Sequence, residues 1–159
     1  MNILKIDHQN LHNIHSLIEN INNSCNIFVL IHWKECNPCK TILPKWQNIM
    51  KHSQIKQLSP NDTVIATVEQ GCLTHISHNA FQNIESFPTI VHIKNNIVKP
   101  HKINWNDPTN TFMNWILEIN NKEPSLKYYP NHHSLLKKKK KKTKRKNRRL
   151  HQKSRKNKK

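Results

Sequence analysis

The stretch "FVLIHWKECNPCKTILPKW", residues 28–46, decides the fold of this chain. It begins in a continuous run of apolar, mostly β-branched residues, which is typical of a strand buried on both faces. Two cysteines, Cys36 and Cys39, follow within one helical turn of each other, and the apolar residues after them recur at helical spacing. Pro44 falls inside this helix, where it removes one backbone hydrogen bond, so the sequence predicts a kink there.

By itself, the cysteine pair is open to three interpretations. It could be a redox-active dithiol, two ligands of a metal ion, or two small residues of the core. A zinc site would need more ligands, and the candidates His75 and His78 are closer together than the usual histidine ligands, with no second CxxC motif. We therefore expect no metal site. The other two cysteines, Cys25 and Cys72, are isolated and are expected to be ordinary thiols.

The rest of the body alternates between strand and helix patterns. Apolar residues at helical spacing separate the strand-like runs, and a hairpin is expected to turn at Asn95 and Asn96, which tolerate positive φ. This order predicts an α/β fold, a three-layer α/β/α sandwich with a mixed central sheet. Strands are expected at 1–7, 26–33 and 62–70, a hairpin at 89–103, and helices at 10–21, 39–50, 73–84 and 106–120, the last with Asp107 as N-cap and Pro108 at its first position.

The positive charge belongs almost entirely to one end of the chain. Residues 137–159 hold 16 of the 27 lysines and arginines and no acid, whereas residues 1–136 hold 11 bases and 9 acids. A segment of this composition cannot bury enough apolar area to offset its ordering entropy. We therefore predict a folded domain over 1–121, a linker over 122–136 and a disordered polybasic tail over 137–159.

The composition also bears on where the protein works. No secretory signal pattern starts the chain, and the longest apolar run, Ile27 to Ile31, is far shorter than the roughly 20 residues of a membrane span. Four cysteines do not resemble the disulfide framework of a small secreted domain. We expect an intracellular monomer, cytoplasmic or nuclear, without a transmembrane segment. The abundance of Asn, Lys and Ile fits an AT-rich genome, and we hypothesise a large DNA virus, in which case the virion is a further location.

Several motifs together resemble a known family. The CNPC motif at residues 36–39 stands between a buried strand and a helix and is followed by Lys40, while Pro44 and Trp46 lie in that helix. Farther on, "SFPTIVHIKNNIV" places Pro88 before a strand and hairpin. Over residues 1–121 the chain resembles a thioredoxin domain, of the plain thioredoxin or protein disulfide isomerase type.

This resemblance implies thiol–disulfide exchange on protein disulfides or dithiols. Cys36, at the start of a helix, would attack as a thiolate favoured by unpaired N–H groups and the helix dipole, and Cys39 would resolve the mixed disulfide. The Cys36–Cys39 disulfide would be the redox group, with no separate cofactor. A cis bond is expected at Phe87–Pro88.

Substrate contacts are also implied by the resemblance. Phe87, Pro88 and Thr89 would face the cysteines and pair with the substrate chain. Trp33, three residues before Cys36, is a further candidate for substrate contact. The alternative is that Trp33 is buried in the core.

Two positions depart from the family's pattern. Glu35 stands where an aromatic residue usually precedes the first cysteine, and Leu30 stands where many thioredoxins bury an acid that assists proton transfer. We hypothesise that Glu35 weakens thiolate formation, opposed by Lys34, Lys40 and His32. The alternative function is a non-catalytic scaffold of this fold that binds nucleic acid without sequence preference.

The tail, Lys137–Lys159, is a candidate site for nucleic acid or another polyanion. A nuclear localisation signal, adhesion to an acidic membrane and simple solubility are the other interpretations. No aromatic residue interrupts these charges, so the tail has no platform on which bases could stack.

Truncation after Ser134 should abolish retention of the protein on immobilised duplex DNA. Full-length protein should bind different sequences equally and lose affinity steeply between about 50 and 200 mM salt, because binding releases counterions. Filter binding at several salt concentrations measures this slope. A salt-insensitive affinity would refute the electrostatic account.

Overall fold

A five-stranded mixed sheet forms the centre of the computed structural model, which describes residues 1–102, 104 and 107–122. The strand order is β1-β3-β2-β4-β5, with β1, β3 and β2 parallel and β4 and β5 antiparallel to their neighbours. The strands are β1 (Asn2–Ile6), β2 (Asn26–His32), β3 (Thr63–Glu69), β4 (Thr89–Lys94) and β5 (Ile97–His101). The α-helices are α1 (Asn13–Asn22), α2 (Asn37–Lys51), α3 (Ser53–Lys56) and α4 (Thr109–Lys122), and two 3-10 helices are η1 (Gln70–His75) and η2 (Asn79–Phe81).

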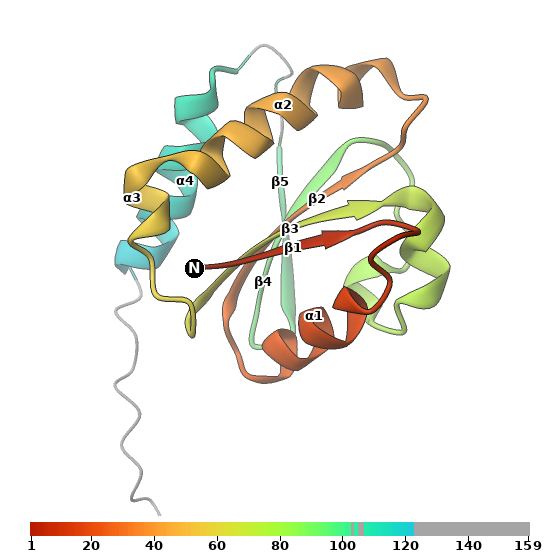
Figure 1. Cartoon of the computed structure of the whole chain (residues 1–159), viewed down its shortest axis with the longest axis horizontal. Helices are drawn as coiled ribbons and strands as arrows, with labels where there is room; N and C mark the ends of the chain where they lie inside the picture. The colour runs from red at the N-terminus through yellow and green to blue at the C-terminus, as the bar shows by residue number, and fades with distance from the viewer. Residues whose placement is uncertain (103, 105–106, 123–159) are drawn as a thin grey trace, which may run out of the picture. The chain divides into compact units, whose positions relative to one another are not determined.

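Helices cover both faces of the sheet. In Figure 1, α1 lies on one face and α2 and α4 on the other, so the predicted three-layer α/β/α sandwich is confirmed. Strand β2 shows why: its side chains alternate between two separate apolar clusters, Val29 in the cluster under α1, and Phe28 and Leu30 in the cluster under α2 and α4. We call the side that carries Phe28 and Leu30 the α2 face. A central strand that is apolar on both faces requires two covering layers.

The hairpin between β4 and β5 forms as predicted. Asn95 and Asn96 have φ values of 51° and 61° and join the strands in a two-residue turn, with Lys94 paired to Ile97. Both positions lie in the left-handed region, which asparagine tolerates better than other residues with a side chain.

The helix predicted over residues 73–84 is wrong. The segment contains η1 and η2 instead, separated by extended backbone at Ile76 and His78, and Asn83 has a φ of 60°. The His78 side chain accepts a hydrogen bond from the Ala80 amide at 3.1 Å, and such local bonds compete with helix formation. The apolar residues of the segment still pack into the core under α1, so the pattern gave the core side chains but not the backbone: Ile76, Ala80 and Phe81 are buried, and Leu73 and Ile84 are partly buried against them.

Other boundaries differ in detail. The last helix starts at Thr109, so Asp107 precedes it by two residues instead of capping it, and the short α3 had no counterpart in the predictions. Pro44 lies inside α2 as expected. Except for Lys122, the predicted linker and polybasic tail lie outside the described residues. Within the described part of the chain, no helix is long and apolar enough to cross a membrane.

A polar network fastens α4 to the sheet. The Asn120 Oδ1 accepts hydrogen bonds from Thr63 Oγ1 at 2.7 Å and from Asn26 Nδ2 at 3.4 Å. Asn26 Oδ1 lies 3.0 Å from Nε2 of His92, and all three partners on the strands are buried. Because buried polar groups are costly when unpaired, Asn120 satisfies groups on two strands at once.

Replacing Asn120 by alanine should lower the free energy of unfolding by roughly 1–3 kcal/mol, because Thr63 and Asn26 lose their acceptor. Denaturant unfolding followed by circular dichroism measures the change. The matched control is Asn121→Ala at the exposed neighbouring position, which should change stability little. Equal effects of the two substitutions would contradict the role of the network.

Candidate active site

The cysteine motif lies at the junction of β2 and α2. Cys36 is the N-cap of α2, with φ −77° and ψ 116°, and its sulfur accepts a hydrogen bond from the Cys39 amide at 3.2 Å. Its carbonyl accepts from the Lys40 amide at 3.1 Å. The sulfur therefore lies where the first turn leaves amide donors unpaired, and these donors and the helix dipole favour a negative charge.

The two cysteines form a disulfide, and their Cα atoms are 5.2 Å apart. Cys36 is 9% exposed and Cys39 is 2% exposed, so the first cysteine is the more exposed of the two. An incoming thiol or disulfide would reach Cys36 before Cys39. This asymmetry suits an attacking and a resolving sulfur, roles that stay predictions.

The loop before β4 faces the motif. The Phe87–Pro88 peptide bond is cis, and the carbonyl oxygen of Phe87 lies 3.3 Å from the Cys36 sulfur. When the disulfide is reduced, a Cys36 thiol can donate to this oxygen, whereas a thiolate would be repelled by it. The carbonyl thus favours the thiol and the Cys39 amide favours the thiolate. The structure brings these two opposing contacts to one sulfur.

The other candidate substrate contacts differ in exposure. Trp33 is 45% exposed next to the motif, and its carbonyl accepts from the Cys36 amide at 3.3 Å. Thr89 is half-buried and donates its hydroxyl to the Ser86 carbonyl at 2.7 Å, while Pro88 is buried. Trp33 is therefore not buried in the core, and its contact with a substrate stays a prediction.

The position of Leu30, where the resemblance would place a buried acid, has uncharged partners. Leu30 is fully buried on the α2 face and pairs with Thr67 of β3 and Ile90 of β4. Of the two residues in register with Leu30, Thr67 has a hydroxyl group and Ile90 has a hydrocarbon side chain. No carboxylate stands at Leu30, its Thr67 partner or its Ile90 partner to handle a proton.

Two residues farther along these strands, charged groups gather. His32 of β2 pairs in register with Glu69 of β3, and Glu69 is 7% exposed. Lys34 forms an ion pair with Glu69 at 3.0 Å, and this bond raises the pKa of the Lys34 ammonium. Burial lowers the pKa of His32, and the negative charge of Glu69 opposes this effect. Lys34 is thereby directed toward Glu69, which the sequence did not indicate.

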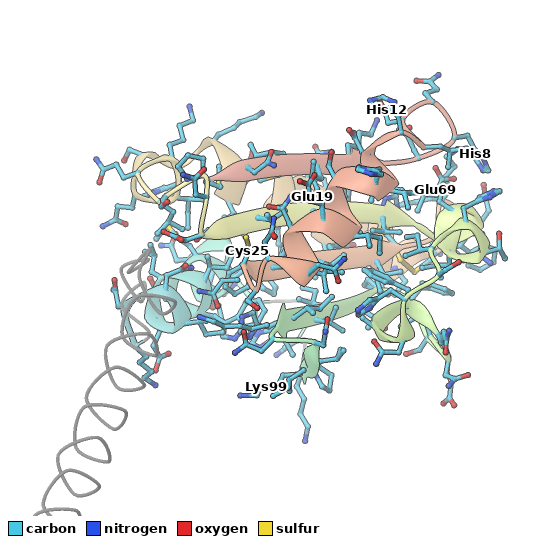
Figure 2. The ribbon with its side chains drawn as sticks, turned by 90° about the horizontal axis from the view of Figure 1, so that it is seen from below. His8, His12, Glu19, Cys25, Glu69 and Lys99 are labelled. Carbon is cyan, nitrogen blue, oxygen red and sulfur yellow. A yellow bond between two sulfur atoms is a disulfide. The ribbon has the colours of Figure 1, made fainter. Side chains whose placement is uncertain are left out.

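Sequence reasoning missed Glu69. Its only signal was an acid at the carboxyl end of a buried parallel strand, the edge at which functional groups gather in such sheets. Figure 2 shows Glu69 at the same end of the sheet as His8 and His12, and away from Cys25.

The other two cysteines take no part in the disulfide. Cys25 and Cys72 are free and buried, and burial raises the pKa of both thiols. Across residues 1–102, 104 and 107–122, no three or more His, Cys, Asp or Glu side chains are grouped closely enough to hold a metal ion.

Sequence comparison identifies no relative. No protein-family model matches the chain, and no curated protein matches it.

Solved structures do match. The first thioredoxin domain of mouse protein disulfide-isomerase A4 has a TM-score of 0.51 and 17% identity, over 82% of this chain and 82% of that one. Human ERp44 form II has a TM-score of 0.56 and 17% identity, over 74% of this chain and 30% of that one. The J-Trx1 fragment of ERdj5 has a TM-score of 0.53 and 13% identity, over 74% and 51%.

The chain has a thioredoxin-like fold. The expected resemblance and these structural matches are consistent with the observed strand order and with the cysteine pair at the start of α2. Identities this low show the fold alone. The chain spans about half of the ERdj5 fragment and about a third of ERp44.

Glu35→Gln should move the pH midpoint of Cys36 alkylation downward by roughly half a unit or less, since exposed charges are screened by solvent. The physical reason is that Glu35 is exposed beside Cys36, while Lys34 is engaged by Glu69. Iodoacetamide labelling of reduced protein against pH measures the midpoint. The control is Glu19→Gln at an exposed position of α1, which should leave the midpoint unchanged. An unchanged midpoint for Glu35→Gln would end the hypothesis.

Proposed function

We propose that the chain is a thiol–disulfide oxidoreductase acting on protein disulfides or dithiols. The observation that supports this best is the Cys36 sulfur, which caps α2, is bonded to Cys39 and lies beside the Phe87 carbonyl. A pair of small core residues would need neither the N-cap position nor the facing loop.

The reaction would proceed through a mixed disulfide. In the reducing direction, the Cys36 thiolate attacks a substrate disulfide, one substrate sulfur leaves as a thiolate that takes a proton, and a Cys36–substrate disulfide forms. The Cys39 thiol then loses its proton and attacks the Cys36 sulfur, which releases the second substrate sulfur. The chain is oxidised to the Cys36–Cys39 disulfide and the substrate is reduced by two electrons. The reverse sequence would oxidise a dithiol.

The site offers a surface for a substrate chain. Trp33 is exposed, and the loop Phe87–Thr89 reaches the Cys36 sulfur through the Phe87 carbonyl. We propose these residues as substrate contacts.

The tail would determine where in the cell the protein acts and would take no part in the thiol–disulfide exchange. We propose that Lys137–Lys159 holds the protein near nucleic acid or another polyanion, inside the cell and in the cytoplasm or nucleus, or in a virion if the source is a large DNA virus. The monomeric state is part of the same proposal. The competing function is a scaffold that binds nucleic acid and has little redox activity, which the apolar surroundings of Leu30 favour.

Cys36→Ser should abolish reduction of a protein disulfide by the full-length chain, since the attacking sulfur is gone. Cys39→Ser should form a mixed disulfide with the substrate that persists, because no resolving thiol follows. Insulin reduction in the presence of dithiothreitol measures the first effect, and non-reducing electrophoresis with mass spectrometry measures the second.

The control is Cys72→Ser, which removes a buried thiol outside the pair and should retain activity. Equal activity of Cys36→Ser and the unmodified chain would overturn the proposed function and favour the scaffold.

A further inference from the structure

The resolving step needs a base that the apolar site around Leu30 does not supply. Cys39 is 2% exposed, so water has little access to its thiol proton. The thiol must nevertheless become a thiolate before it can attack. A proton acceptor near the buried side of α2 is therefore required.

The direction in which α2 runs over the sheet indicates where a proton acceptor for Cys39 should be sought. The buried side of α2 consists of Cys39, Ile42, Trp46 and Ile49, and its apolar members share one cluster with Leu30. Figure 1 shows α2 running back over the sheet from the end of β2. One turn from Ile42 toward the start of the helix, about 5 Å, leads to Cys39. Two residues from Leu30 toward the end of β2, about 7 Å, lead to His32 in the same direction.

The His32 side chain lies on the α2 face of the sheet, the face that Cys39 also covers. Phe28 and Leu30 belong to the α2 face, and strand side chains alternate, so His32 falls on this face as the next member of the row. Its partner in register, Glu69, continues the row of Ile65 on β3, which packs in the same cluster. An imidazole and a carboxylate therefore stand in register one level beyond Leu30, on the face of the sheet that α2 covers.

We propose that His32, supported by Glu69, accepts the proton of the Cys39 thiol when that thiol attacks the mixed disulfide. This proposal rests on the proposed function. The bond between the Cys39 and Cys36 sulfurs forms, the bond from Cys36 to the substrate sulfur breaks, and the electron pair leaves with the substrate thiolate. The proton moves from Cys39 to the imidazole and then to the departing thiolate or to solvent.

The charges around His32 suit this role. Burial favours the neutral, proton-accepting imidazole and lowers the pKa of His32. Glu69 and Asp7 raise that pKa and would stabilise the imidazolium formed in the step, whereas Lys34 and Lys5 lower it. Lys34 forms a 3.0 Å ion pair with Glu69, the residue in register with His32.

A two-phase reaction separates the resolving step from the first attack. The reduced full-length chain is mixed in a stopped-flow instrument with a chromogenic aryl disulfide, which releases one coloured thiolate when Cys36 attacks and a second when Cys39 resolves. Cys39→Ser should lack the second phase, which assigns that phase to Cys39. The aryl thiolate leaves without a proton, so the second phase reports on the base alone.

His32→Gln should slow the second phase about tenfold or more near neutral pH and leave the first phase within about twofold. The deficit should shrink as pH rises above the ordinary pKa of a cysteine thiol, about 8.5, where Cys39 ionises without help. Glu69→Gln should shift the acid limb of the second phase to lower pH, because the group that raises the pKa of His32 is lost. His15→Gln, the same change at an exposed position of α1, should match the unmodified chain.

The outcomes are distinct. A second phase of His32→Gln that equals the unmodified chain, or that is slowed by the same factor at every pH, would overturn the proposal, since the latter marks a purely structural effect. A persistent acid limb at an unchanged pH in Glu69→Gln would also contradict it. Absence of the first phase in the unmodified chain would instead overturn the proposed function.

Discussion

The hydrogen bond from the Cys39 amide to the Cys36 sulfur fixes the N-cap of α2, just after the end of β2. It can form only because Cys36 has extended backbone angles while the next residue already begins the helix. β2 holds this junction at the centre of the sheet, since its alternating apolar side chains are packed between two helical layers. The chemistry of the sulfur thus depends on a strand whose central residues, Ile27 to Ile31, are all apolar.

The site combines segments that are remote in sequence. The Phe87 carbonyl approaches Cys36 because β4 pairs antiparallel to β2, which brings the start of β4 to the end of β2. Glu69 approaches His32 because β3 pairs parallel to β2 on the other side. A central strand with one parallel and one antiparallel neighbour therefore brings a carbonyl to Cys36 from β4 and a carboxylate to His32 from β3. Neither group is next to the motif in the chain.

This explains what the sequence could and could not predict. Local patterns sufficed for β2, for the helix start at Cys36 and for the turn at Asn95 and Asn96, because each depends on neighbouring residues only. The ion pair of Lys34 with Glu69 depends on strand register, which no local pattern specifies. The helix expected over 73–84 was wrong because its apolar spacing reports which side chains are buried, whereas turn-forming side chains decide the backbone.

The turns of this chain are made almost without glycine. Its single glycine, Gly71, does not have a positive φ, and among the residues that the structure describes the left-handed positions are occupied by Ser24, Asn83, Asn95 and Asn96. A residue with a side chain samples fewer backbone states in the unfolded chain than glycine does, so less conformational entropy is lost when these turns become ordered. The energetic cost of the four left-handed residues in the folded state is thus partly offset by the lower conformational entropy of the unfolded chain.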